Sequence, residues 1–270
     1  MQEENEIMTL VKNEVHEGVQ VLRLQNGPTN ALSPRLVTEL EAALRAALGT
    51  AEGGGVGDGL GAARGLVLAG GEKFFSIGLD LPTLLELDRA EMSKFWAGFE
   101  ETVLELYTLP VPTVAAIGGH ATAGGLILAL ACDFRFATPG RKLLGLNEVK
   151  IGVAVPFLAH LMLAQAVGER TARKMGLKGE FLGPQEALAQ GLVDRLVGGE
   201  DGAAVVEEAV REVGAMAAFP PLGFGVAKRN STEAVRRVFM ESRQERLDEA
   251  MDLWFHEETQ RYLQVAAKKF

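Results

Sequence analysis

The chain has 270 residues, of which 47% are hydrophobic and 23% charged, as is ordinary for a globular protein with a large buried core. Its formal net charge of −9 argues against nucleic-acid binding as its main function. The single cysteine, Cys132, rules out an internal disulfide and is expected to pack inertly in a buried run.

The N-terminal residues and the apolar runs indicate the cellular compartment in which the protein is expected. Residues Met1–Glu6 are acidic and lack the basic and apolar regions of a secretory leader. Glycine or charge interrupts every apolar stretch before it reaches a membrane-spanning length. The four histidines show no ligand spacing with cysteine or carboxylates, so no metal site is expected. The sequence therefore predicts a cytoplasmic protein without a membrane partner.

The N-terminal region predicts a hairpin followed by a helix. A strand over Val19–Leu24 is expected to pair with one near Ile7–Val11, and Asn26-Gly27-Pro28 ends this unit. The pair Ser33-Pro34 is typical of a helix start, and apolar residues follow at helical spacing as far as Ala47. The glycine-rich stretch 49–65 is interpreted as a surface loop, because no strand and lysine-bearing helix flank it as in a phosphate-binding loop.

Short strands and helices then alternate. The expected strands are Leu66–Ala69, Phe74–Gly78, Val111–Ile117, Phe134–Phe136 and Leu143–Leu146. The expected helices are Ala90–Leu106, Phe157–Ala166, Glu169–Leu177, Pro184–Gln190, Ala203–Ala217 and a long tail from about Thr232 to Lys268. This order predicts an α/β core with a helical C-terminal region.

The segment Gly118–Gly125 is a glycine-rich turn between an apolar strand and an apolar helix. Glycine allows a close approach of the backbone to a ligand. The first N–H groups of a helix have no partner within the helix, and the helix dipole is positive there. The turn is therefore suited to hold a negatively charged oxygen.

Three segments in order carry a family resemblance: Phe75–Leu81, the turn Gly118–Gly125 and Leu146–Gly152. Together with the supporting blocks Pro110–Ala116 and Cys132–Arg135, they make the chain resemble the crotonase superfamily from about Val19 to its C-terminus. The resemblance implies a spiral of ββα units over residues 1–200 with an acyl-CoA site. It implies a helical oligomerisation and lid region over 201–270, and a homotrimer or a dimer of trimers. Coenzyme A would be part of the substrate, and no separate cofactor is expected.

The resemblance also implies which residues form the site. Two backbone N–H groups, expected on Ile77 and Gly124, would form an oxyanion hole for the thioester oxygen. The substrate-binding residues would be Ser76, Gly78, Leu79, Asp80, Leu81, Gly125 and Ile127. Asp80 is equally suited to cap a following helix.

The position of the carboxylates favours one reaction of this superfamily. Hydratases use two, one of them three residues after the oxyanion glycine and the other in the third segment. Here the first position is Ile127 and the second is Glu148. One carboxylate is enough to move a proton from C2 to C4 of a 3-enoyl thioester. The pattern around Glu148 is similar to that of Δ3,Δ2-enoyl-CoA isomerases, so Glu148 is the expected acid and base.

Other interpretations stay open at this stage. The chain could hydrate an unusual enoyl-CoA, decarboxylate a substrate or hydrolyse a thioester, or it could bind acyl-CoA without catalysis. His120 is expected to be a packed side chain. Five lysines could meet the phosphates of coenzyme A, although each could equally be a solvated surface charge: Lys73, Lys142, Lys228, Lys268 and Lys269.

Overall fold

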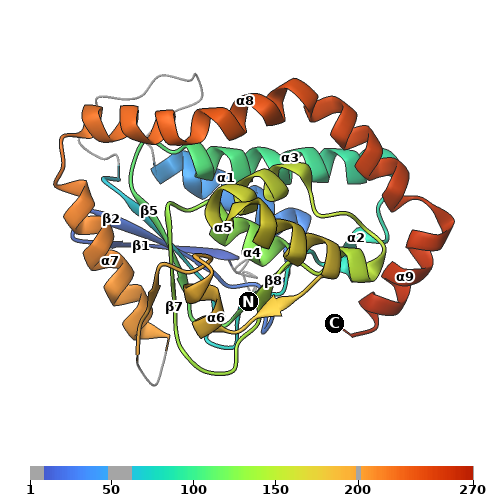
Figure 1. The fold of residues 1–270 in the computed structure, drawn as a ribbon, viewed down its shortest axis with the longest axis horizontal. Helices are drawn as coiled ribbons and strands as arrows, with labels where there is room; N and C mark the ends of the chain where they lie inside the picture. The colour runs from blue at the N-terminus through green and yellow to red at the C-terminus, as the bar shows by residue number, and fades with distance from the viewer. Residues whose placement is uncertain (1–8, 48–62, 199–201, 270) are drawn as a thin grey trace, which may run out of the picture.

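The computed structural model describes residues 9–47, 63–198 and 202–269. A six-stranded sheet, in the order β1-β2-β3-β5-β7-β10, forms one part of the core (Figure 1). Its strands are β1 (Val11–His16), β2 (Val19–Leu24), β3 (Leu66–Ala69), β5 (Thr113–Ile117), β7 (Phe134–Ala137) and β10 (Arg195–Leu196). All neighbours pair in parallel except β1 and β2. The expected α/β core is therefore confirmed.

The predicted hairpin exists, but its first strand lies further along the chain. Residues Glu17 and Gly18 form the turn, both with positive φ, and pair His16 with Val19. A two-residue turn of this kind fixes the register of a hairpin. The first strand therefore covers Val11–His16 rather than a region near Ile7, which lies outside the described residues. The glycine-rich stretch 49–65 lies mostly outside them as well.

A second, four-stranded sheet carries the loops of interest, in the order β4-β6-β8-β9. Its strands are β4 (Phe74–Ser76), β6 (His120–Thr122), β8 (Leu144–Gly145) and β9 (Phe181–Leu182). Strands β4, β6 and β8 are parallel, so their carboxyl ends lie at one edge. The three segments singled out in the sequence end or begin at this edge.

Helices surround the two sheets. The first group is α1 (Pro34–Ala47), α2 (Leu81–Leu84), α3 (Arg89–Thr108), α4 (Gly124–Leu130) and the 3-10 turn η1 (Glu148–Ile151). The second group is α5 (Phe157–Lys178), α6 (Pro184–Ala189), α7 (Ala203–Ala217), α8 (Pro221–Trp254) and α9 (Glu257–Ala267). Gly168 has non-helical angles inside α5, which agrees with the prediction of two helices there.

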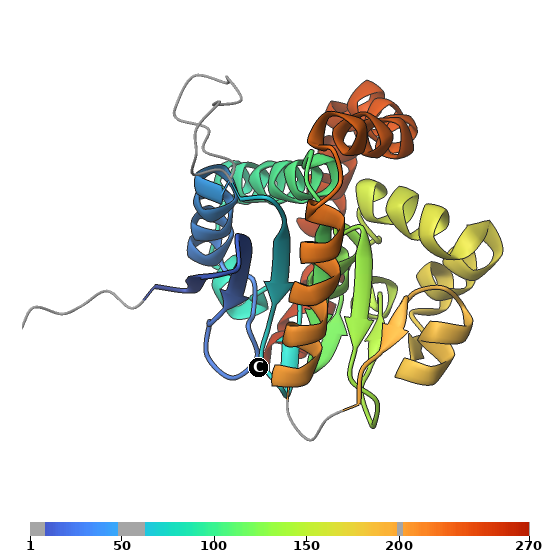
Figure 2. The ribbon, with the colours of Figure 1, turned by 90° about the vertical axis from the view of Figure 1, so that its left-hand side faces the viewer.

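Helix α7 packs across the large sheet (Figure 2). The strand residues Val19, Val21, Val67 and Val114 face it and form a small core of their own. Their neighbours in sequence, such as Leu22 and Leu68, point to the main core on the opposite face. Successive side chains of a strand point to opposite faces, so a strand buried on both sides contributes every second residue to each core.

The C-terminal tail differs from the expected single helix. Helix α8 begins at Pro221, well before Thr232, and α9 starts only after His256, whose Nδ1 accepts a hydrogen bond of 3.3 Å from the N–H of Glu258. The tail runs over α3 and then turns, so that α9 lies near α2 (Figure 1).

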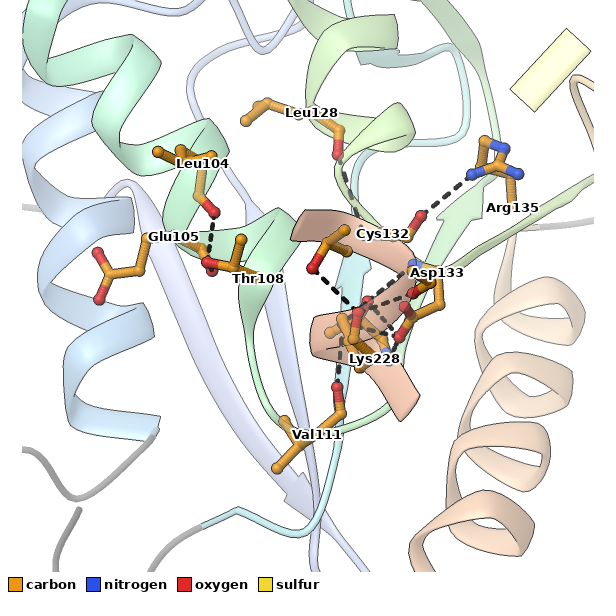
Figure 3. Close-up of polar contacts among 12 residues, drawn as sticks. Leu104, Glu105, Thr108, Val111, Leu128, Cys132, Asp133, Arg135 and Lys228 are labelled. Carbon is orange, nitrogen blue, oxygen red and sulfur yellow. Dashed lines mark hydrogen bonds and ion pairs between the residues drawn. The ribbon is translucent and has the colours of Figure 1, made fainter. Parts of the chain in front are cut away.

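A buried ion pair fixes α8 to the sheet. The ammonium of Lys228 lies 2.8 Å from the Asp133 carboxylate and also donates to the carbonyl of Val111 (Figure 3). Asp133 in turn accepts from the N–H and hydroxyl of Thr113 at the start of β5. Cys132, next to this cluster, is buried with a free thiol, and burial raises its pKa to about 12. Its inert packing agrees with the sequence interpretation.

Candidate active site

The loop after β4 is held by its own side chains. The Ser76 hydroxyl donates to the Asn30 carbonyl at 2.7 Å and accepts from the N–H of Gly78 at 3.1 Å. Asp80 caps α2, because its carboxylate accepts from the N–H and the hydroxyl of Thr83. The capping interpretation of Asp80 is confirmed, and both polar side chains serve the shape of the loop.

The N-terminus of α4 is pressed against this loop. A Cβ on Gly125 would lie 2.3 Å from the carbonyl oxygen of Ser76, so only glycine fits there. Ala123, just before the helix, has a positive φ of 48° although it is not a glycine. Such strain persists only where the surroundings enforce it, and it gathers at functional sites.

Two backbone N–H groups come together where the two segments meet. A Cβ built on Gly124 would lie 3.5 Å from the backbone nitrogen of Leu79. Within the described residues, no protein acceptor takes the N–H of Leu79 or that of Gly124. Both residues line the same cavity. The pair is therefore free to donate to one bound oxygen.

The N–H of Ile77, which the sequence analysis assigned as a donor, points elsewhere. It donates to the carbonyl of Thr29 at 3.0 Å. The carbonyl of Ile77 accepts from the Thr122 hydroxyl at 2.9 Å, so both sides of its backbone are engaged. Its side chain still lines the cavity. Within the described chain, the unpartnered N–H of this loop is therefore that of Leu79, two residues after Ile77.

Glu148 begins the turn η1 and is the buried acid of the site. It is only 7% exposed, and its Oε2 has neither solvent access nor a hydrogen-bond partner among the described residues. Burial raises the pKa of Glu148 to about 7, against a smaller opposing effect of its own backbone N–H. A carboxyl group that titrates near neutral pH is suited both to accept and to return a proton.

These groups share one cavity of about 370 Å³, which we call the Glu148 cavity. Its walls are mostly apolar, and the residues that line it include Ile77, Leu79, Leu81, Trp96, Phe99, Gly124, Ile127, Glu148, Ile151, Val153, Pro156, Phe181 and Trp254. Glu148 is the one carboxylate among the described residues that line it. Of the predicted substrate-binding residues, Leu79, Leu81 and Ile127 line it, whereas Ser76, Gly78, Asp80 and Gly125 lie behind it and shape the loops.

Two other titratable residues line the cavity. The Nδ1 of His120 accepts from the N–H of Leu143 at 2.9 Å, and its ring lies 5.1 Å from that of Phe74. Burial and two nearby lysines lower the pKa of His120, so it is neutral at pH 7. Lys269 is exposed and belongs to the C-terminal end of the chain. Of the five candidate lysines, Lys228 is buried in the ion pair with Asp133 and is excluded as a phosphate ligand.

Part of the cavity wall comes from distant helices and was not predicted from the sequence. Trp96 and Phe99 come from α3, Trp254 from the end of α8, and Ala266 follows on α9. An apolar residue on an amphipathic helix gives no sign of which surface it will meet. Helix α9 of the same chain lies at the cavity, since Ala266 lines it and the Thr259 hydroxyl donates to the Gly152 carbonyl at 3.3 Å.

No group of three or more histidine, cysteine or acidic side chains in the described parts of the chain could hold a metal ion. Among the described helices, none is both long enough and apolar enough to cross a bilayer.

Solved structures share the overall fold. The human mitochondrial delta3-delta2-enoyl-CoA isomerase superposes with a TM-score of 0.87 at 27% identity, over 96% of this chain and 97% of that one. An enoyl-CoA hydratase from Bacillus halodurans superposes with a TM-score of 0.81 at 23% identity, over 95% of this chain and 99% of that one. The architecture is thus the crotonase fold, as the sequence resemblance implied.

The sequence comparisons agree. The pattern of the family described as enoyl-CoA hydratase/isomerase matches residues 14–265, so the chain belongs to this family, within the crotonase superfamily. It is 34% identical to the mouse protein "Enoyl-CoA delta isomerase 1, mitochondrial" over 190 residues, which are 70% of this chain and 62% of that protein. It is also 34% identical to a "Probable enoyl-CoA hydratase" of Bacillus subtilis over 203 residues, 75% of this chain and 74% of that protein.

Proposed function

We propose that the protein moves the double bond of a 3-enoyl-CoA thioester to the 2-position. The observation that carries this proposal is that, among the described residues, Glu148 is the one carboxylate lining a cavity whose other walls are mostly apolar. His120 also lines it, but its Nδ1 is engaged by the N–H of Leu143, and Lys269 is exposed, so Glu148 is the group placed to take and return a proton at carbon. Double-bond migration needs no more than that.

The thioester oxygen would be held by the N–H groups of Leu79 and Gly124. Removal of a proton from C2 spreads negative charge onto this oxygen as a dienolate forms. Fixed donors stabilise that charge without reorganising, and one such donor is typically worth about 3–4 kcal/mol. The free N–H of each residue and the strained Ala123 before α4 support this assignment.

Glu148 would take the proton from C2 and deliver it to C4. The C2–H bond breaks, the electron pair moves through the enolate to form the C2–C3 double bond, and C4 gains the proton as the C3–C4 double bond is lost. A pKa of about 7 suits both halves of this transfer at neutral pH. No water enters the balance, which fits the apolar walls.

Hydration of a 2-enoyl-CoA is the second candidate, because a relative of comparable identity is named as a probable hydratase. In a hydratase a second carboxylate would help to hold and activate water. The corresponding position here is Ile127, which is buried and lines the cavity. This side chain is what favours isomerisation over hydration.

The test is an assay with 3-hexenoyl-CoA on the wild type and on two variants. Glu148→Gln keeps the size of the side chain but cannot act as a base, and we expect the rate to fall about 10²–10⁴-fold. Glu105→Gln is the matched control, because Glu105 is also a partly buried glutamate with a raised pKa, but it lies on α3 beside Arg45, away from the cavity. Full activity of Glu148→Gln, or no 2-enoyl product from the wild type, contradicts the proposal.

A further inference from the structure

The Glu148 cavity is open on one side and buried on another. His120 and Leu143 lie together on the open side, since the N–H of Leu143 donates to Nδ1 of His120 and Leu143 is 44% exposed. Phe99 and Trp254, which line the cavity from α3 and α8, are only 2% and 1% exposed. The charged coenzyme A group of a thioester stays in water, because burial of an unpaired charge is costly. The acyl chain would therefore run past Glu148 toward these two helices.

Two tryptophans meet on the buried side, and we call their side chains the tryptophan wall. Trp96 lies on α3, and Trp254 is the last residue of α8. Their rings meet edge to face with 6.4 Å between the centroids, a favourable arrangement for two aromatic rings. The carbonyl of Trp254 accepts a hydrogen bond of 2.7 Å from Nε2 of Gln260 on α9, which ties the end of α8 in place. The wall is therefore a fixed boundary of the cavity.

The protein is not closely packed on the far side of the tryptophan wall. A second cavity, of about 490 Å³, is lined by the same two tryptophans together with Val153 and Pro156. Its other lining residues include charged side chains such as Arg173 and Glu249, so it differs in character from the Glu148 cavity. A smaller side chain in the wall would therefore widen the Glu148 cavity on a side where the packing is already incomplete.

We propose that the tryptophan wall sets the longest acyl chain that the Glu148 cavity accepts, and that the substrates are enoyl-CoA thioesters of short and medium chain length. This inference deepens the proposed function and rests on it for the position of the thioester at Leu79 and Gly124. The cavity volume of about 370 Å³ supports it, because this value lies near the lower end of the range for ligand cavities.

The wall should leave a mark on the dependence of affinity on chain length. Each methylene group that leaves water for the apolar cavity should tighten binding by about fourfold. Once the chain reaches the two indole rings, further methylene groups find no room, because a packed interior resists the insertion of extra volume. The affinity should then stop rising with chain length.

The test is the binding of saturated acyl-CoA thioesters, which cannot be isomerised. Isothermal titration calorimetry of the wild type with the even-numbered chains from butanoyl-CoA to tetradecanoyl-CoA gives the chain length at which the affinity stops rising. We expect this limit at or before decanoyl-CoA. Free coenzyme A serves as the reference for binding without an acyl chain.

Three variants locate the limit. Trp254→Leu and Trp96→Leu each remove one ring of the wall, from different helices, so that either one can test it if the other does not fold. Each should move the limit by at least two carbons and bind the thioester of that length about tenfold more tightly than the wild type does. Phe239→Leu is the matched control, because Phe239 is also a fully buried aromatic residue of α8 but lines neither cavity. It should keep the limit of the wild type.

The results for the wall and for the proposed function can be told apart. An affinity that keeps rising as far as tetradecanoyl-CoA in the wild type overturns the inference, while isomerisation of 3-hexenoyl-CoA would still stand. An unchanged limit in a folded tryptophan variant, or a shifted limit in Phe239→Leu, also overturns it. A wild type that shows the limit but does not isomerise 3-hexenoyl-CoA would refute the proposed function alone. If the wild type binds none of the thioesters, both fail.

Discussion

Gly78 approaches Gly124 and the start of α4 so closely that its position has no room for a larger residue. A Cβ on Gly78 would lie 3.0 Å from the backbone nitrogen of Gly124 and 2.8 Å from the Cβ of Ala123. Gly78 also has a φ of +102°, which other residues rarely adopt. The contact sets the distance between the loop of Leu79 and the start of α4, on which the proposed oxyanion hole depends.

We therefore expect Gly78→Ala to lower kcat/KM for 3-hexenoyl-CoA by about 10²–10³-fold, the loss typical of one misplaced oxyanion donor. Gly98→Ala is the control. Gly98 lies within α3, a Cβ there would meet nothing within 4 Å, and alanine should stabilise the helix by up to about 1 kcal/mol. Wild-type activity of Gly78→Ala would argue against the proposed hole.

The activity should depend on the ionisation of Glu148. Since burial raises the pKa of Glu148 to about 7 and the base must be ionised, kcat/KM should fall as the pH is lowered through about 7. His120 and Lys269 are the other titratable residues that line the cavity. A pH–rate profile of His120→Gln should keep the same midpoint. A midpoint near the ordinary glutamate value of about 4.3 in the wild type would contradict the buried state of Glu148.

The burial of Glu148 also lowers the free energy of unfolding when its carboxyl group is ionised. Its pKa is raised in the folded state from 4.5 to about 7, so the folded protein binds the proton more tightly than the unfolded chain. The free energy of unfolding therefore falls as pH rises from about 4.5 to 7, by roughly 3 kcal/mol for this group. Glu148→Gln should be more stable than the wild type at pH 8, by about 1–3 kcal/mol after the cost of burying an amide.

Urea unfolding at pH 8 and at pH 5 measures this difference, which should shrink at the lower pH. An inactive variant that is less stable than the wild type at pH 8 would mean that the loss of activity reflects damage to the fold.

The buried pair of Lys228 and Asp133 should matter for stability without touching the site. Removal of the Lys228 ammonium leaves the partly buried Asp133 carboxylate with only the N–H and hydroxyl of Thr113, so Lys228→Met should cost about 3 kcal/mol of unfolding free energy. The double variant with Asp133→Asn should recover part of this loss. Urea unfolding of the single and double variants checks the coupling, and a loss of under about 1 kcal/mol in the single variant would contradict it.

The sequence predicted the elements that depend on local pattern. The strands around Val67, Val114 and Phe136, the turn before α4 and the break near Gly168 follow from apolar runs and glycine positions. The Glu17-Gly18 turn fixes the register of the first hairpin, and the apolar pattern alone does not reveal this turn. Helix α8 begins with proline at its first position, a local start signal that the apolar spacing from Thr232 onward did not include.

The sequence motifs predicted which segments come together, but not which backbone N–H groups are free or which distant helices line the cavity. The segments of Leu79, Gly124 and Glu148 were placed together correctly, because their order along the chain matched a family pattern. The N–H of Ile77 donates to the carbonyl of Thr29, so it is not free to bind a ligand in the cavity. No local sequence pattern reveals this hydrogen bond. Trp254 comes from a helix more than 100 residues away from Glu148, so only the tertiary structure brings it to the cavity.

The ratio of isomerised to hydrated product is the most direct test of whether the protein is an isomerase. Purified enzyme should be given 3-hexenoyl-CoA and, separately, 2-hexenoyl-CoA, and both 2-enoyl and 3-hydroxyacyl products should be quantified by chromatography. We expect rapid formation of 2-hexenoyl-CoA from the first substrate, abolished in Glu148→Gln, and hydration of the second at least tenfold slower. Hydration as fast as or faster than isomerisation would contradict the assignment of Glu148 as the sole acid and base of an isomerase.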